Sequence, residues 1–437
     1  MGSAIKMWKI LPLLVAMLFL SGVICAKGLI DSSPKNETDS VVSFPSARSF
    51  LHSSICVADH FRFESNYLHQ LSFETRPEYI IPTIEFLEGH NYDKKPIRNA
   101  FSAHLKYSFK ALPNSISDRV YKGAYQGIGI SYFSFGERQQ IGNPIGVYLF
   151  QGARIARLGS RVSLNYEWNF GLSFRWKPYD YYENYYNTVI GSKVNAYMNV
   201  NFYFKWMLSK YFDFIGGVTL THFSNGNTKY PNAGLNTTGA KIGFVYNFNR
   251  HKDVLAQTHY PASIPEFMRH ISYDLALFGA WRRKGIVIDN EYVASPHAYP
   301  VAGFCFAPMY NFGYRFRAGV SLDGFYDGSA NIYNQDYTNS GKPDFVTPPI
   351  RFQTALGLSV RGEYVMPYFS VNVGLGANVL HNGGDLRGLY QILALKVGIT
   401  RNSYLHIGYS LKDFHLPNFL MLGVGFRFNN KYPALRR

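Results

Sequence analysis

The chain has 437 residues, of which 17% are aromatic and only 16% are charged, and its formal net charge is +16. Soluble domains usually carry about 25% charged residues, so this balance argues against an ordinary soluble enzyme. Beyond the N-terminal segment no apolar run of about 18 residues occurs, which argues against a helical membrane protein. An apolar, aromatic-rich exterior is typical instead of an all-β, antiparallel transmembrane β-barrel of the bacterial outer membrane.

Residues 1–26 have the pattern of a secretory signal peptide. Lys6 and Lys9 precede an apolar run from Ile10 to Cys25, and the run ends in small residues. The run is shorter than the roughly 20 residues that a spanning helix needs. We therefore expect export through the inner membrane, with an uncleaved anchor or a lipoprotein signal as alternatives. Residues 27–75 lack clear periodicity and are expected to form a periplasmic N-terminal extension.

Alternating side chains predict about eight membrane-crossing strands in residues 76–250. From Arg161 to Trp176 every odd residue is polar or small and every even residue is apolar. Successive side chains of a strand point to opposite faces, so one face of this segment is wholly apolar. Residues 198–208 repeat the pattern. These strands are long enough to cross a bilayer when tilted, whereas a soluble β-sandwich would have shorter ones.

The connections between the expected strands alternate in length. Tight turns are expected at residues 158–160 and 208–211, and a long polar loop rich in tyrosine and asparagine lies between them at 178–195. Outer-membrane barrels have short periplasmic turns and longer external loops, so the long loops mark the external end of each strand.

The segment from Val218 to Tyr246 contains the candidate chemistry. Parity places His222 and Ser224 together on the apolar, lipid-facing side of one strand near its external end. Asn236 begins the same face of the returning strand. Polar groups that face lipid are costly unless they bond to one another or have a function.

This arrangement suits a nucleophile, a base and an orienting group. In this interpretation His222 takes the proton of the Ser224 hydroxyl, and Asn236 accepts a hydrogen bond from the other ring N–H. Asn225 and Gly226, through side-chain or backbone N–H groups, would support an oxyanion. The natural electrophile at this place is an ester carbonyl of a membrane lipid. The alternative is an interfacial polar cluster without catalysis.

The motif resembles the active-site segment of the lipid A 3-O-deacylase family. The residues that carry the resemblance are His222, Ser224 and Asn225, followed by Pro231, Asn232 and Gly234. The resemblance implies an outer-membrane barrel of about eight strands that removes the ester-linked acyl chain at the 3-position of lipid A. It is expected to extend over residues 76–250. The family usually has a glutamate at the position of Asn236, so the third member of the triad departs from the family pattern.

The same segment also resembles outer-membrane phospholipase A. That family has His-x-Ser-Asn-Gly and a catalytic asparagine at the spacing of Asn236. Its Ser-Arg-rich, calcium-linked stretch is replaced here by residues 228–231, which favours the deacylase. We therefore expect no metal and no cofactor, with calcium required only if the chain acts as a phospholipase. The expected partners are lipid A of lipopolysaccharide, or phospholipid, and the membrane itself, with no nucleic acid; the oligomeric state is left open.

The positive net charge is compatible with a phosphorylated lipid substrate. Cations near the external rim would hold the phosphates of lipid A. By residue type alone the candidates are Lys229, Arg250, Arg282, Arg283 and Lys284. The alternative for each of them is a place in a turn or in the lumen.

Residues 251–268 contain two prolines and interrupt the strand pattern before about eight further strands in residues 269–437. This connection joins either two barrels of roughly eight strands or two parts of one barrel of about 16, and the single barrel is favoured. A barrel of that size could enclose a channel, so a non-catalytic channel or structural barrel is a further alternative function.

No His-x-Ser sequence recurs around His406 and His415, near the end of the second half, so we expect that half to be non-catalytic. Both halves nevertheless have a Pro-Asn pair before their last strand, at residues 231–232 and 417–418. This shared feature suggests a duplicated unit.

Overall fold

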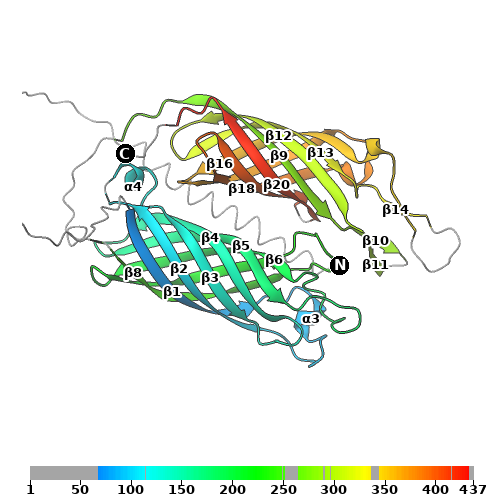
Figure 1. The fold of residues 1–437 in the computed structure, drawn as a ribbon, viewed down its shortest axis with the longest axis horizontal. Coiled ribbons are helices and arrows are strands. Elements are labelled where there is room, and N and C mark those ends of the chain that lie inside the picture. The colour runs from blue at the N-terminus through cyan, green and yellow to red at the C-terminus, as the bar shows by residue number, and fades with distance from the viewer. Residues whose placement is uncertain are drawn as a thin grey trace, which may run out of the picture.

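The computed structural model describes residues 67–432, apart from residues 114, 249, 251–263, 289–290, 296, 336–343 and 415. These residues form two closed antiparallel barrels of eight strands each (Figure 1). The prediction of an antiparallel transmembrane β-barrel is therefore confirmed, whereas the preference for one large barrel is wrong. The predicted signal peptide and most of the predicted extension lie outside the described residues.

The strands of each barrel follow one another in chain order. The first barrel contains β1 (Tyr67–Ile80), β2 (Asn99–Ala111), β3 (Tyr125–Ser134), β4 (Gly142–Arg157), β5 (Val162–Trp176), β6 (Val194–Met207), β7 (Phe212–Ser224) and β8 (Leu235–Asn247). The second contains β9 (His270–Arg282), β12 (Tyr299–Asn311), β13 (Phe316–Asp327), β16 (Thr354–Val365), β17 (Phe369–Leu380), β18 (Leu389–Gly398), β19 (Ser403–Lys412) and β20 (Leu416–Phe428).

Short elements occupy the connections. They are α3 (Glu85–Glu88), α4 (Ile116–Val120), the two-stranded sheets β10 (Gly285–Ile288) with β11 (Glu291–Ala294) and β14 (Tyr333–Asn334) with β15 (Phe345–Val346), and the 3-10 turns η2 (Ile350–Phe352) and η3 (Gly384–Leu386). Among the described residues, no helix is long and apolar enough to cross a membrane. The predicted tight turns at residues 158–160 and 208–211 join β4 to β5 and β6 to β7, and the long loop joins β5 to β6.

The first strand begins at Tyr67, so the predicted boundary between an extension and a barrel at Arg76 is wrong. Alternate side chains of β1 point outward, but the outward row includes His69, Thr75 and Pro77. These three residues interrupt the apolar row that would have marked the strand. The strand is nevertheless formed, because its backbone pairs with β2 along its length.

Each barrel closes on its own first strand. In the first barrel β8 pairs with β1, from Gln70 opposite Asn247 to Ile80 opposite Thr237. In the second barrel β20 pairs with β9. Closure depends on which two strand edges meet, and a residue's parity along its own strand carries no information about that choice.

Ion pairs fill the lumen of the first barrel. Lys106 Nζ lies 2.6 Å from Oε1 of both Glu74 and Glu167, and Lys241 Nζ lies 3.1 Å from Glu167 Oε1. All four side chains are buried. The polar face of the alternating segment from Arg161 to Trp176 therefore points into the lumen at Glu167.

The second lumen is filled in the same manner. Lys396 Nζ lies 2.8 Å from Asp274 Oδ2 and 2.7 Å from Glu363 Oε2, and Arg317 pairs with both carboxylates. An eight-stranded barrel is just wide enough for its side chains to fill. The described parts of the two barrels thus enclose no wide aqueous channel, which argues against the channel alternative. Two barrels of the same strand number with similar luminal networks also support the duplication hypothesis.

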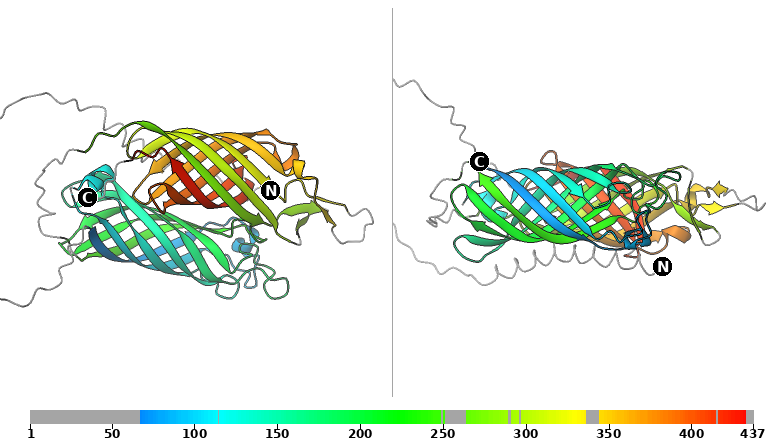
Figure 2. Two further views of the ribbon diagram at one scale, coloured as in Figure 1. Left: turned by 45° about the horizontal axis from the view of Figure 1, so that its top comes forward. Right: turned by 90° about the horizontal axis from the view of Figure 1, so that it is seen from below.

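The two barrels lie side by side and touch through their outward-facing walls (Figures 1 and 2). The rings of Trp168 on β5 and Phe369 on β17 are 5.2 Å apart in an edge-to-face arrangement. The Tyr166 hydroxyl donates to Met366 Sδ at 3.6 Å, in the tight turn between β16 and β17. These side chains are mostly buried, so one barrel covers part of the apolar wall of the other.

Candidate active site

The candidate triad lies where β7 ends and β8 begins, at the end of the first barrel that carries the long loops. His222 is directly opposite Asn236 in the ladder between these strands, and Ser224 is the last residue of β7. The side chains of His222 and Ser224 are half-buried on the outward-facing wall, and Asn236 is 9% exposed. The structure therefore brings the three predicted residues together on one face of two adjacent strands.

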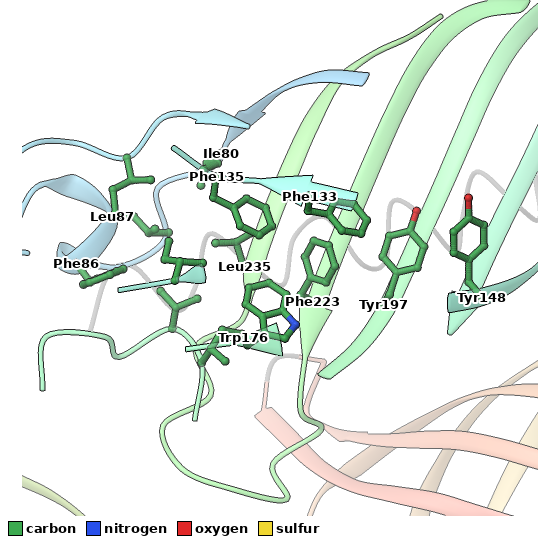
Figure 3. Packing of buried hydrophobic residues seen from close by; sticks show 14 of the residues in the cluster. Ile80, Phe86, Leu87, Phe133, Phe135, Tyr148, Trp176, Tyr197, Phe223 and Leu235 are labelled. Atoms are coloured by element: carbon green, nitrogen blue, oxygen red, sulfur yellow. The ribbon is translucent and has the colours of Figure 1, made fainter. Parts of the chain in front are cut away.

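An aromatic core inside the barrel holds this end of both strands. Phe223, between His222 and Ser224, points inward and is fully buried (Figure 3). Its ring centroid lies 5.0 Å from those of Phe133 and Trp176. Leu235, opposite Phe223 on β8, belongs to the same cluster. Because the inward side chains are locked by packing, their outward neighbours are held in a fixed position on the wall.

The imidazole of His222 is oriented by Asn236. His222 Nδ1 lies 2.7 Å from Asn236 Oδ1. An amide oxygen only accepts hydrogen bonds, so Nδ1 carries the proton and the Nε2 lone pair of the neutral ring is free to accept one. Gly234, at φ 75°, closes over the ring, and a Cβ there would lie 3.0 Å from His222 Cε1. The motif therefore requires glycine at this position for conformational and steric reasons.

The loop between Ser224 and Asn236, here called the motif loop, holds the Ser224 hydroxyl in place. Ser224 Oγ accepts from Gly226 N at 3.1 Å and from Asn232 Nδ2 at 3.0 Å, and lies 3.3 Å from Asn232 Oδ1. Within the described site, Ser224 has no hydrogen bond to His222. The expected Ser–His bond is thus absent here, as is common in substrate-free active sites, where catalytic hydrogen bonds tighten only when substrate binds.

Gly226 is better placed than Asn225 to stabilise an oxyanion. Both donor nitrogens of Asn225 already bond to the loop, because its backbone N–H donates to Asn232 Oδ1 at 2.9 Å and its side-chain amide donates to Lys229 O at 2.6 Å. The N–H of Gly226 points at the Ser224 oxygen instead. Sequence reasoning assigned Asn232 only to the motif loop and missed its contact with the hydroxyl, which depends on a loop conformation that strand parity does not specify.

The second barrel touches the motif loop. A Cβ on Gly226 would lie 2.9 Å from two side-chain carbons of Leu420 on β20, and Asn227 O accepts from the backbone N–H of Arg283 at 3.1 Å. The loop between Ser224 and Asn236 is therefore supported from outside by the second barrel as well as from inside by the aromatic core.

The basic residues singled out by type are mostly engaged elsewhere. Arg250 pairs with Asp213 at 2.7 Å, at the end of the barrel opposite the candidate triad, so its proposed contact with phosphate at the external rim is wrong. Arg282 and Lys284 pair with acidic residues of the second barrel. Lys229 is exposed in the motif loop. Arg283 contacts that loop through its backbone.

The second barrel lacks the triad. When its Pro-Asn pair is matched to that of the first barrel, Leu422 takes the position of Asn236, and counting back from the pair places Gly408 and Ser410 at the positions of His222 and Ser224. Ile407 is opposite Leu422 in the ladder, as His222 is opposite Asn236. An isoleucine and a leucine provide neither a base nor an orienting acceptor, so this wall offers no equivalent chemistry.

The fold is that of a transmembrane β-barrel protein of the bacterial outer membrane, with an exposed apolar exterior and a polar, ion-paired interior. Residues 271–430 match the family model for the C-terminal domain of acyloxyacyl hydrolases. This match supports the resemblance to outer-membrane acyl hydrolases. It falls on the second barrel, however, whereas the resemblance was expected over the first.

Solved structures of outer-membrane proteins are similar at low sequence identity. The outer membrane enzyme PagL is 13% identical, with 41% of this chain and 99% of that chain covered and a TM-score of 0.25. Neisserial surface protein A is 8% identical, with 42% and 98% covered and a TM-score of 0.26. No curated protein sequence matches the chain. The fold assignment therefore depends on the strand pairing of this chain itself.

Proposed function

We propose that the protein is an outer-membrane lipid esterase that removes an ester-linked acyl chain from lipid A, with Ser224 as nucleophile, His222 as base and Asn236 as orienting group. The observation that carries the proposal is the hydrogen bond from His222 Nδ1 to Asn236 Oδ1, beside Ser224, on a wall that faces lipid. The match of the second barrel to acyloxyacyl hydrolases supports the same reaction class.

The reaction follows from the positions of these groups. Ser224 Oγ attacks the ester carbonyl while its proton passes to His222 Nε2, and the negative charge on the carbonyl oxygen is stabilised by the N–H of Gly226. When the tetrahedral intermediate collapses, the sugar oxygen leaves with the proton from His222. Water then attacks the acyl-enzyme, again losing its proton to His222, and releases the fatty acid. Asn236 holds the ring in place throughout.

The wall around the triad suits a substrate that stays in the membrane. Ala196 and Met198 on β6 are opposite Ser224 and His222, and Val218 further along β7 is 59% exposed. An acyl chain can lie along this apolar surface while its ester reaches the headgroup level. The enzyme therefore needs no deep pocket to bind the chain that it cleaves.

The proposal is tested by mass spectrometry of lipids incubated with the purified full-length protein. The mixture contains lipid A and phospholipid, with calcium or with a chelator. We expect lipid A to lose one 3-linked acyl chain regardless of calcium. Lysophospholipid formed only with calcium would assign the protein to the phospholipases instead, and two unchanged lipids would contradict both esterase functions.

Replacing Asn236 tests whether His222, Ser224 and Asn236 form a catalytic triad or a polar cluster without catalysis. Asn236→Ala is expected to lower the deacylation rate by on the order of 10²- to 10⁴-fold, because the imidazole loses its acceptor. Asn236→Glu should keep most of the activity, since a carboxylate accepts the same N–H. Asn378→Ala, which removes a half-buried amide from β17, is the matched control. Equal rates for the Asn236→Ala and control variants would rule out the orienting role.

A further inference from the structure

A basic pocket opens on the first barrel, at the ends of β3, β4 and β5 that carry the long loops. Its volume is about 380 Å³. The residues that line it are Tyr132, Arg138, Gly142, Asn143, Arg175 and Lys177. The candidate triad shares none of these residues, so the proposed esterase mechanism leaves the pocket without a role.

A break in the alternation of β5 turns Arg175 into this pocket. Phe174 is exposed on the outer wall, so strict alternation would turn Arg175 inward and Trp176 outward. Arg175 instead has φ 69° and is exposed, and Trp176 is 3% exposed in the aromatic core. The ladder between β4 and β5 shifts register opposite this residue, between Gly142 and Ile145. Such irregularities commonly re-aim a side chain near a functional site.

The inward position of Trp176 and the outward position of Arg175 are coupled, because the two residues are adjacent in β5. Trp176 is fixed inside by its packing against Phe135 and Phe223 and by donating from Nε1 to Ser173 Oγ at 2.9 Å. Outside, Gly142 has φ 88°, and a Cβ there would lie 2.9 Å from Arg175 O. Packing in the core of the barrel thus fixes the outward direction of Arg175. It does so although arginine rarely adopts a left-handed backbone conformation.

The charged groups that line the pocket are all cations. Its three cations are exposed, and the residues that line it include no carboxylate. The neighbouring acid, Glu137, is buried and accepts the backbone N–H groups of Gln139 and Gln140. Asn143 Nδ2 donates to Tyr132 Oη at 2.8 Å, which leaves the tyrosine O–H to donate to a ligand. Positive charge with convergent donors is the chemistry that binds phosphate.

The apolar wall beside the pocket indicates that the phosphate belongs to a ligand with acyl chains. Further along the same three strands, Ile130, Val147 and Leu172 point outward and are about half exposed, at 50%, 52% and 49%. A ligand with acyl chains against this wall would hold its headgroup at the level of the pocket. β4, at the centre of the pocket, is three strands from β7 in a barrel of eight, so this headgroup faces a different side of the barrel from Ser224.

We propose that Arg138, Arg175 and Lys177 bind the phosphate of a phosphorylated lipid headgroup of the outer leaflet, at a site separate from the esterase site. The bound lipid is retained rather than cleaved. This binding site does not depend on the proposed esterase activity, since the two sites lie on different strands.

The test measures lipid binding to the full-length protein in neutral detergent by native mass spectrometry. The probes are diphosphorylated lipid A, its dephosphorylated form and inorganic phosphate. The variant is Arg138→Gln with Lys177→Gln, and the control is Lys94→Gln with Lys95→Gln, which removes two exposed cations from the loop between β1 and β2. We expect the pocket variant alone to bind phosphorylated lipid at least about tenfold more weakly, as loss of charge-assisted hydrogen bonds predicts.

Several binding results would contradict the proposal. Unchanged binding by the pocket variant, or an equal loss in the control, would overturn it. If inorganic phosphate bound as tightly as the lipid, or if dephosphorylated lipid bound equally well, the assignment to a phosphorylated lipid would be wrong. Deacylation by the pocket variant should stay within about twofold of the native rate, and a protein without esterase activity should still show the binding difference.

Discussion

Ser224→Ala is expected to lower the release of fatty acid from lipid A by at least about 10³-fold, because the hydroxyl that forms the acyl-enzyme is lost. The barrel should fold normally, since Ser224 is the last residue of β7 and its side chain bonds only within the motif loop. The rate is measured by mass spectrometry of lipid A after incubation with the refolded protein. Folding is followed by the heat-dependent shift in electrophoretic mobility that closed barrels show.

The matched control is Ser134→Ala, which removes a half-buried hydroxyl from the corresponding end of β3. It should leave the rate unchanged. Substantial deacylation by a folded Ser224→Ala protein would eliminate the serine mechanism. An equal loss in both variants would point to a general disturbance of the external rim instead.

Glu167→Ala should destabilise the first barrel by about 3–5 kcal/mol, because it removes one of the two carboxylates that pair with the buried Lys106 and Lys241 and leaves their charge only partly balanced. Glu167 accepts from Lys106 at 2.6 Å and from Lys241 at 3.1 Å, and both lysines are fully enclosed in the lumen. Urea unfolding in lipid vesicles, followed by tryptophan fluorescence, measures the change. Asp93→Ala, in an exposed part of the loop between β1 and β2, serves as the control and should unfold like the native protein.

Glu363→Ala gives an independent comparison in the second barrel, where the Glu363 carboxylate pairs with Arg317 and Lys396. Its effect should match that of Glu167→Ala if luminal ion pairing stabilises both barrels. An unfolding midpoint unaffected by either change would show that the strand ladders and the lipid-facing walls alone account for the stability.

Local periodicity predicts the strands of this protein well, because the direction of a side chain is decided residue by residue along the backbone. The alternation through β5 and the tight turns on either side of it follow from that rule. The start of β1 is hidden by polar and cyclic residues in its outward row. The choice between one barrel and two depends on the pairing of β8 with β1, which is a contact between distant segments.

The distinction between local periodicity and contacts formed by several segments also applies to the candidate site. Parity is sufficient to place His222, Ser224 and Asn236 on one wall, since all three belong to regular strands. The hydroxyl's contact with Asn232 depends on a loop conformation, and sequence reasoning missed it. The outward turn of Arg175 was also missed, because it requires a register shift and an aromatic core that are formed by several strands together.

The closure of each barrel on its own first strand has a consequence for how such a chain can change over evolutionary time. Because β8 completes the first barrel and β20 the second, a break between Asn247 and His270 leaves no unpaired strand edge on either product. The surfaces uncovered by separation, at Trp168 and Phe369, are apolar and can be covered by lipid tails. Gene fission would therefore yield two complete membrane proteins, and gene fusion could have joined two such proteins without any new strand pairing.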